Sequence, residues 1–130
     1  MPEKKKIFIA DDDEAILVSL RKLLELSDFI VQTTRNPKDI LPMIKAFRPN
    51  IILLDLLMPD LGGMEICEML NSDAQTQGIP IIIISALADE KDIKRAYRLG
   101  VTGYFIKPYD FNGLLKEINR TIAYKEGKVE

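Results

Sequence analysis

The chain has 130 residues, of which 47% are hydrophobic and 29% charged, a balance typical of one compact globular domain. It contains no histidine and a single cysteine, Cys67, which excludes Ser-His-Asp and Cys-His catalysis, zinc sites built from these residues and an intrachain disulfide. The 20 acidic and 18 basic side chains give a net charge of −2, so we expect no general affinity for nucleic acids.

The apolar segments are too short for a secretory signal or a membrane span. The basic residues 4–6 are followed only by the apolar residues 7–10 before a run of acids. The other apolar runs fall far below the roughly 20 residues that cross a bilayer. We therefore expect a cytoplasmic protein that does not contact membranes and whose Cys67 is reduced.

Five short segments, each bounded by turn residues, have the length and composition of β-strands. They are mostly rich in isoleucine or aromatic residues, and the second is more polar. The third and fourth are strongly apolar, which is typical of central strands that are buried on both faces of a parallel sheet. The expected strands are residues 7–10, 30–34, 51–54, 81–84 and 104–106.

Helical spacing fills the first two intervals between these strands. The first helix is expected to bury a face made of Ile16, Leu20, Leu23 and Leu24. The second begins with Asn36 as N-cap and Pro37 at the first helical position. Because Pro42 removes one helical hydrogen bond, we expect this second helix to be short, kinked or irregular. Its inner face is expected to contain Ile40, Ile44 and Phe47.

Three further helices are expected in the second half of the chain. One runs over about residues 64–70 and ends in the polar residues 71–78. Asp89 can cap the next, which carries Ile93, Ala96 and Tyr97, and Gly100 can end it. Asp110 can cap the last, whose apolar stripe is Phe111, Leu114, Leu115, Ile118 and Ile122. Five successive β-then-α units predict one α/β domain, a parallel sheet with helices on both faces.

Polar side chains follow four of the five predicted strands. In open parallel sheets, ligands bind at the carboxyl ends of the strands, so we expect these side chains to share one site. Each also has a purely structural interpretation as a helix cap, a turn residue or a solvated charge, and their common placement favours the site. The residues, in chain order, are Asp11, Asp12, Asp13, Asp55, Ser85 and Lys107.

These residue types suit phosphoryl transfer to an aspartate. Carboxylates brought together resist ionisation unless a cation joins them, and an all-oxygen set of ligands favours Mg²⁺, held by Asp12 and Asp55. Asp55 is an adequate nucleophile because a carboxyl with a reference pKa of about 3.9 is ionised at neutral pH. Lys107 would pair with a phosphoryl oxygen, and Ser85 would donate a hydrogen bond to it.

Four motifs on these strand ends carry a resemblance to a known family. They are Asp11-Asp12, residues 51–60 with Gly63 following, Ser85-Ala86, and residues 104–108. In this order they resemble the receiver domain of two-component response regulators, including the chemotaxis response regulators. The resemblance covers about residues 5–124, so residues 1–130 are expected to form a single receiver domain.

The resemblance implies a flavodoxin-like fold, a three-layer sandwich whose strands run in the order 2-1-3-4-5. It implies that Asp55 accepts a phosphoryl group from a sensor histidine kinase or a histidine phosphotransfer protein. It also implies a Mg²⁺ ion bound by Asp12, Asp55 and the backbone carbonyl of Leu57, with Asp11 acting mainly through water. Such a domain is not an enzyme on other molecules; it phosphorylates itself from a donor and loses the group slowly.

The resemblance also implies a conformational switch. The hydroxyl of Ser85 moves toward the phosphoryl group, and Tyr104 turns inward into the space left. The change is read at the face of the fourth helix, fifth strand and fifth helix by a downstream effector or in a phosphorylation-dependent homodimer. Tyr104 also has the simpler interpretation of a half-buried strand aromatic. The Lys107–Pro108 bond is expected to be cis.

One position departs from the commonest family pattern, and two others lie where the family's side chains vary in their effect on the acyl phosphate. Gly62 stands where the family often has aspartate, which could loosen the turn before the third helix. Leu57 and Leu87 lie two residues beyond Asp55 and Ser85, where the family's side chains influence access of water to the acyl phosphate. We hypothesise that these two apolar side chains slow spontaneous loss of the phosphoryl group.

Other functions fit the sequence less well. A phosphatase of the haloacid dehalogenase type needs a second aspartate where Leu57 stands, and no glycine-rich loop of a nucleotide enzyme is present. A flavin carrier is disfavoured because the acidic run at residues 11–13 would repel its phosphate. Two alternatives stay open: a pseudo-receiver that binds partners without phosphorylation, and a receiver fragment of a longer DNA-binding regulator.

Overall fold

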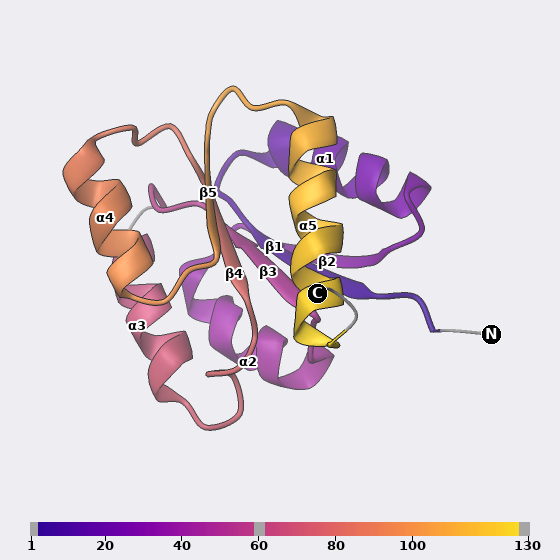
Figure 1. Ribbon diagram of the computed structural model, residues 1–130, viewed down its shortest axis with the longest axis horizontal. Coiled ribbons are helices and arrows are strands. Elements are labelled where there is room, and N and C mark those ends of the chain that lie inside the picture. Colours follow the sequence, from indigo (N-terminus) through magenta and orange to yellow (C-terminus); the bar gives the residue numbers. More distant parts are fainter. Residues whose placement is uncertain (1–2, 59–61, 128–130) are drawn as a thin grey trace.

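The computed structural model describes residues 3–58 and 62–127, which form a parallel sheet between two layers of helices (Figure 1). The sheet has five strands in the order β2-β1-β3-β4-β5. This order confirms the predicted α/β class and the strand order 2-1-3-4-5. The strands are β1 (Lys6–Ala10), β2 (Ile30–Thr34), β3 (Ile51–Leu54), β4 (Ile81–Ser85) and β5 (Gly103–Ile106).

The helices cover both faces of the sheet, and each face has its own buried cluster. One cluster joins the sheet to α2, α3 and α4, and the other joins it to α1 and α5 (Figure 1). All residues of β3 and β4 are buried, as their uniformly apolar sequences predict. The helices are α1 (Glu14–Leu26), α2 (Pro37–Phe47), α3 (Gly63–Ser72), α4 (Glu90–Arg98) and α5 (Phe111–Lys125).

Short polar side chains begin most of these helices. Asp13 accepts hydrogen bonds from the first turn of α1, and Asn36 caps α2 by accepting from the N–H of Lys38. The predicted caps of α4 and α5, Asp89 and Asp110, also accept backbone N–H groups. These caps satisfy donors that have no partner within the helix, so they fix where each helix starts.

The buried face of α1 differs from the expected one. Leu17, Leu20 and Leu24 face the sheet, whereas Leu23 is 42% exposed and Ile16 is only partly buried. The helix carries more apolar positions than the sheet can cover, and the stripe that packs is centred closer to Leu17. The prediction for Leu23 was therefore wrong.

The sequence predicts a short, kinked or irregular α2 because of Pro42, and the structure contradicts a short or interrupted helix. The helix runs unbroken for 11 residues through this proline. Pro42 lies on the exposed side of α2, and so does Lys38, whose carbonyl loses its helical donor. Water can satisfy that carbonyl there, which keeps the cost of the missing hydrogen bond low.

The remaining boundaries lie close to the predicted ones. Gly100 has a φ of 95° just beyond α4, as expected of a residue that ends a helix. α3 extends to Ser72, two residues past its expected end. Within the motif of residues 51–60, Pro59 and Asp60 lie outside the described residues.

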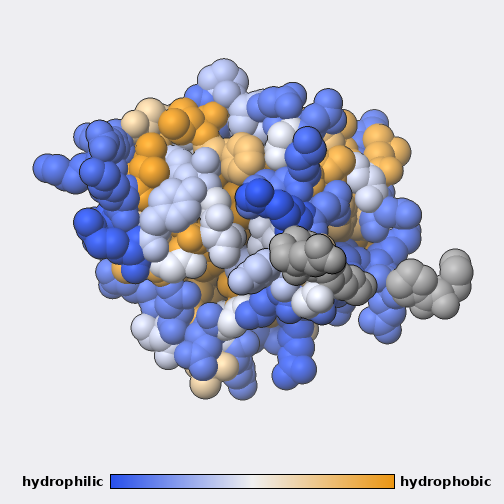
Figure 2. Space-filling view, in the orientation of Figure 1, coloured by the Kyte–Doolittle hydropathy of each residue, from blue (hydrophilic) through white to orange (hydrophobic). Residues whose placement is uncertain are grey.

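The surface and the single cysteine are consistent with the composition. Figure 2 shows hydrophilic residues over most of one face, with hydrophobic side chains in smaller groups. None of the helices in the described ranges combines the length and hydrophobicity needed to cross a membrane. Cys67 packs fully buried in α3 as expected, and burial raises the pKa of its thiol to about 12.

Candidate functional site

The carboxyl ends of adjacent strands bring three aspartates together. Asp11 follows β1 and Asp55 follows β3, and these side chains are almost fully buried, with 3% and 4% of each residue exposed. Asp12, next in the chain, is exposed. One carboxylate oxygen from each of the three lies within 4.8 Å of the others. Three of the four predicted aspartates therefore form an acidic cluster, whereas Asp13 instead caps α1 by accepting the N–H groups of Ala15 and Ile16.

Backbone hydrogen bonds fix the two buried aspartates. The N–H of Asp55 donates to the carbonyl of Ala10 at 3.0 Å, which continues the pairing of β1 and β3. Each carboxylate also holds its own loop, because Oδ1 of Asp11 accepts from the N–H of Asp13 and Oδ1 of Asp55 accepts from the N–H of Leu57, both at 2.9 Å. The Oδ2 atoms are thereby left for contacts inside the cluster.

Lys107 supplies the positive charge of this cluster. Its Nζ lies 2.7 Å from Oδ2 of Asp11 and 3.1 Å from Oδ2 of Asp55. Burial opposes the charged form of Lys107, but hydrogen bonds to both carboxylates outweigh it and raise the lysine pKa. The pKa of Asp11 is also raised, mainly by burial and partly by the charge of Asp55, with the Lys107 bond acting against this. The site therefore holds excess negative charge in a poorly solvated place.

The residues present fit a divalent cation with oxygen ligands. The carboxylate of Asp12 is exposed, and within residues 3–58 and 62–127 no hydrogen bond or ion pair engages it. Two further carboxylates lie beside it, and all available donors are oxygen atoms, the ligands that Mg²⁺ prefers. This acidic cluster could hold a metal ion.

Ser85 and Tyr104 meet at the loop between β4 and α4. Ser85 is fully buried, and its Oγ accepts from the N–H of Leu87 at 3.1 Å. The hydroxyl of Tyr104 donates to the carbonyl of the same Leu87 at 2.6 Å. Burial raises the pKa of Tyr104, and the charge of Asp92 adds to this effect. The two residues expected to act in the switch therefore share one contact residue.

Three further expected features are described by the structure. Leu57 is 49% exposed, and its N–H donates to the Asp55 carboxylate. The Lys107–Pro108 bond is cis, as expected. Gly62 precedes α3 without a side-chain cap, and Gly63 packs so closely on Leu56 that it has no room for a Cβ.

Sequence reasoning missed one residue that contacts the acidic loop, which is formed by residues 11–13 between β1 and α1. Arg35 follows β2, and its Nε donates to the backbone carbonyl of Asp12 at 3.1 Å. A strand that ends beside β1 places its next residue near the loop after β1, and this is the signal that could have identified Arg35.

The comparisons with known proteins agree with this geometry. The family model of the response regulator receiver domain matches residues 7–119. Protein PilH of Pseudomonas aeruginosa is 33% identical over 118 residues, covering 91% of this chain and 98% of PilH. Protein RcaC of Microchaete diplosiphon is 32% identical over 123 residues; the match covers 92% of this chain but only 19% of RcaC.

A solved structure shows the same fold. The response regulator receiver domain protein (CheY-like) from Methanospirillum hungatei JF-1 matches with a TM-score of 0.90 and 27% identity, covering 97% of this chain and 99% of that one. Phosphorylation-based signalling is the function of this family. By the family match, the relatives and the acidic cluster, the chain belongs to the response regulator receiver domain family.

Proposed function

We propose that this domain receives a phosphoryl group on Asp55 from a phosphohistidine of a sensor histidine kinase or a histidine phosphotransfer protein. The observation that carries the proposal is the convergence of Lys107, Asp11 and Asp12 on the Asp55 carboxylate. Residues 1–130 contain no histidine, so the phosphoryl donor is a histidine outside this sequence or a small acyl phosphate. A downstream effector protein or domain then responds to the phosphorylated state.

The proposed transfer is a single displacement at phosphorus. A carboxylate oxygen of Asp55 forms a bond to phosphorus while the P–N bond of the phosphohistidine breaks, and the electron pair leaves with the imidazole. Lys107 pairs with a phosphoryl oxygen in exchange for part of its contact with Asp55, and the hydroxyl of Ser85 donates a hydrogen bond to another. Later hydrolysis of the acyl phosphate by water restores Asp55.

The proposed cofactor is Mg²⁺. Asp12, Asp55 and the backbone carbonyl of Leu57 would hold it directly, and Asp11 would act mainly through water. When bound, the ion supplies positive charge that offsets the negative charge of the phosphoryl oxygens. Among the described residues no hydrogen bond or ion pair engages the carboxylate of Asp12, and this availability together with the all-oxygen donor set supports the assignment.

The proposed output is a change on the face made by α4, β5 and α5. The hydroxyl of Ser85 would exchange its contact with Leu87 for the phosphoryl group, and Tyr104 would move with the loop that it holds. An effector, or a second phosphorylated copy, would bind the altered face. We propose no contact of this domain with nucleic acid or with a membrane.

Acetyl phosphate and intact mass spectrometry test the phosphorylation site. In the presence of Mg²⁺ the wild-type protein is expected to gain the mass of one phosphoryl group, and Asp55→Ala to gain none. Asp13→Asn is a matched control, because Asn also caps helices well and Asp13 lies outside the acidic cluster. If Asp55→Ala is labelled as strongly as the wild type, Asp55 is not the phosphoryl acceptor. If the wild type is not labelled, the result favours a pseudo-receiver.

The hypothesis about Leu57 predicts the lifetime of the phosphorylated protein. Leu57→Asn is expected to shorten the half-life severalfold, because an amide beside Asp55 can hold a water where the leucine excludes one. The measurement follows loss of the phosphoryl mass after donor removal, with Leu26→Asn on the exposed end of α1 as control. An unchanged half-life in Leu57→Asn would contradict the hypothesis that Leu57 slows loss of the phosphoryl group.

A further inference from the structure

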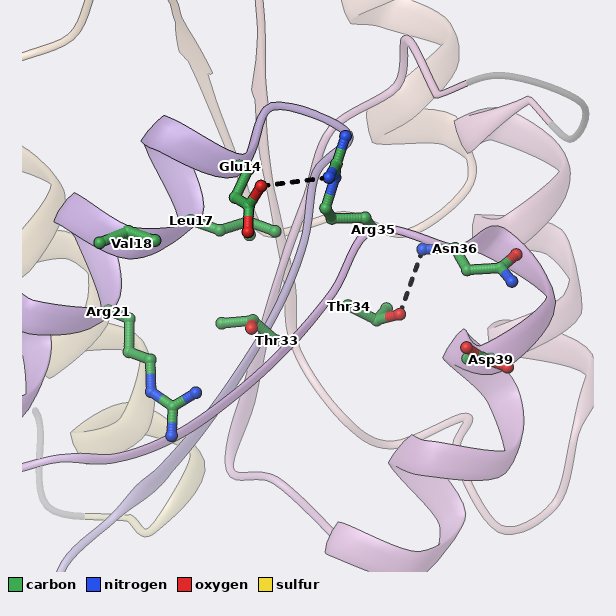
Figure 3. A pocket seen from close by; sticks show the side chains of 9 residues that line it. All are labelled: Glu14, Leu17, Val18, Arg21, Thr33, Thr34, Arg35, Asn36 and Asp39. Atoms are coloured by element: carbon green, nitrogen blue, oxygen red, sulfur yellow. Dashed lines mark hydrogen bonds and ion pairs between the residues drawn. The ribbon is translucent and has the colours of Figure 1, made fainter.

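Arg35 lies where three elements meet beside the acidic loop. It follows β2 and lines a groove of about 530 Å³ between α1, the end of β2 and the start of α2 (Figure 3). In this view Arg35 and Glu14 point toward one another, whereas Arg21 lies on the far side of the groove. The two arginines therefore line the same groove but have different hydrogen-bond partners.

The guanidinium of Arg35 contacts both the acidic loop and the first residue of α1. Its Nε donates to the backbone carbonyl of Asp12 at 3.1 Å. Its Nη1 lies 3.3 Å from Oε2 of Glu14 in the first turn of α1 (Figure 3). A planar guanidinium can make both contacts at fixed angles, which the single ammonium of a lysine cannot.

The backbone on both sides of Arg35 is itself fixed. The carbonyl of Thr34 accepts from the N–H of Asp11 at 3.2 Å, so β2 and the acidic loop are joined there. On the other side, the N–H of Asn36 donates to Oγ1 of Thr34 at 3.1 Å, and Asn36 caps α2 (Figure 3). The arginine thus extends from a rigid base rather than from a free loop.

Asp12 depends on this contact more than its neighbours do. Asp11 is held by the sheet and by Lys107, and Asp13 is held by its bonds to the first turn of α1. For Asp12, the Arg35 contact is the one hydrogen bond found within the described part of the chain. The carboxylate of Asp12 is nevertheless placed close to those of Asp11 and Asp55.

We propose that Arg35 is a positioning residue that orients Asp12 as a ligand for the divalent cation of this site. The inference rests on the proposed function, because it assigns a role toward the proposed Mg²⁺ ion. By holding the Asp12 carbonyl, Arg35 limits rotation of that residue and keeps its carboxylate directed at the cluster. A ligand already in place binds the cation without the entropic cost of being ordered.

A purely electrostatic effect of Arg35 has the opposite sign. A positive charge near a cation site repels the cation, so loss of that charge alone should strengthen Mg²⁺ binding. Loss of the positioning contact should weaken it, by about fivefold if the contact is worth an ordinary hydrogen bond. The direction of the change therefore separates the two roles.

Isothermal titration with Mg²⁺ alone tests the proposal. Arg35→Met is expected to weaken Mg²⁺ affinity about threefold to tenfold, and Arg35→Lys to weaken it in the same direction despite keeping the charge. Arg21→Met is the matched control, since Arg21 lines the same groove but pairs with Glu25 instead of the loop. Without Mg²⁺, Arg35→Met is expected to unfold at a slightly lower temperature, because it loses one hydrogen bond and one exposed ion pair, and Arg21→Met to unfold like the wild type.

Each outcome decides a separate point. Unchanged or stronger Mg²⁺ binding by Arg35→Met would overturn the positioning role, as would an equal loss in Arg21→Met. A wild-type protein that binds no Mg²⁺ would overturn the proposed cofactor itself, and the inference with it. Wild-type binding together with unchanged binding by Arg35→Met rejects only the role of Arg35.

Discussion

Replacing Lys107 with methionine is expected to lower the free energy of unfolding of the Mg²⁺-free protein by about 2 to 3 kcal/mol. The ammonium lies between two almost fully buried carboxylates, and its removal leaves their charges without a partner. The expected loss is smaller than for a fully buried pair because the Lys107 side chain is 18% exposed and water can enter. Urea unfolding at neutral pH measures the loss.

The same variant should gain more stability in mild acid than the wild type does. In the wild type, the folded-state pKa of Lys107 lies above the ordinary 10.5, so its contribution is complete at neutral pH and disappears only in strong alkali. Without Lys107, the already raised pKa of Asp11 rises further. The folded state then binds protons that the unfolded chain does not, and stability increases as the pH falls from 7 toward about 4.

Lys116→Met is the matched control for these measurements. Lys116 lies on the exposed side of α5, and in the described ranges no ion pair joins it. Its replacement should leave both the stability and the pH profile nearly unchanged. A Lys107→Met protein as stable as this control at neutral pH would show that Lys107 does not balance the buried acids.

Gly63→Ala is expected to destabilise the protein by about 2 to 3 kcal/mol and to disturb the loop that follows Asp55. A Cβ at this position would lie 2.4 Å from the Cα of Leu56 and 3.0 Å from the carbonyl oxygen of Asp55. These are backbone atoms, so the clash cannot be relieved by turning a side chain. Phosphorylation by acetyl phosphate should fall together with stability, since the displaced segment contains the acceptor.

Gly113→Ala is a control that should raise the free energy of unfolding, whereas Gly63→Ala should lower it. Gly113 lies in the first turn of α5, where a Cβ would meet the Asp110 side chain at an ordinary 3.5 Å. Alanine there should stabilise the helix by up to about 1 kcal/mol and leave phosphorylation unchanged. Urea unfolding of the two variants compares them directly. Equal stability of Gly63→Ala and wild type would show that α3 can shift away from Leu56.

The sequence was sufficient for the fold because its local signals agree. The β3 and β4 segments are apolar throughout, and Asn36, Asp89 and Asp110 mark helix starts. The buried face of α1 could not be derived, because this helix has surplus apolar residues and tertiary packing selects among them. The helical spacing of Leu23 also fits a buried position, which is why the sequence alone wrongly places it in the core.

The charged residues that meet at the site were also predictable, but the contacts between them were not. Strand ends place Asp11, Asp55 and Lys107 at one edge, which the alternation of strands and helices already implies. That Lys107 bridges both carboxylates depends on the positions of side-chain atoms. The contact of Arg35 with Asp12 joins residues 23 positions apart through a single hydrogen bond and leaves no periodic signal.

The shared contact of Ser85 and Tyr104 has a thermodynamic consequence. The Oγ of Ser85 is engaged with the Leu87 N–H, and the Tyr104 hydroxyl with the Leu87 carbonyl, so neither hydroxyl is idle. If Ser85 moves to a phosphoryl group as proposed, it gains one hydrogen bond and gives up the one from the Leu87 N–H. Because one hydrogen bond replaces another, we expect the two arrangements to differ little in free energy, and a gain of about 1.4 kcal/mol would then change their ratio tenfold. The proposed switch would then be a graded shift between two populations.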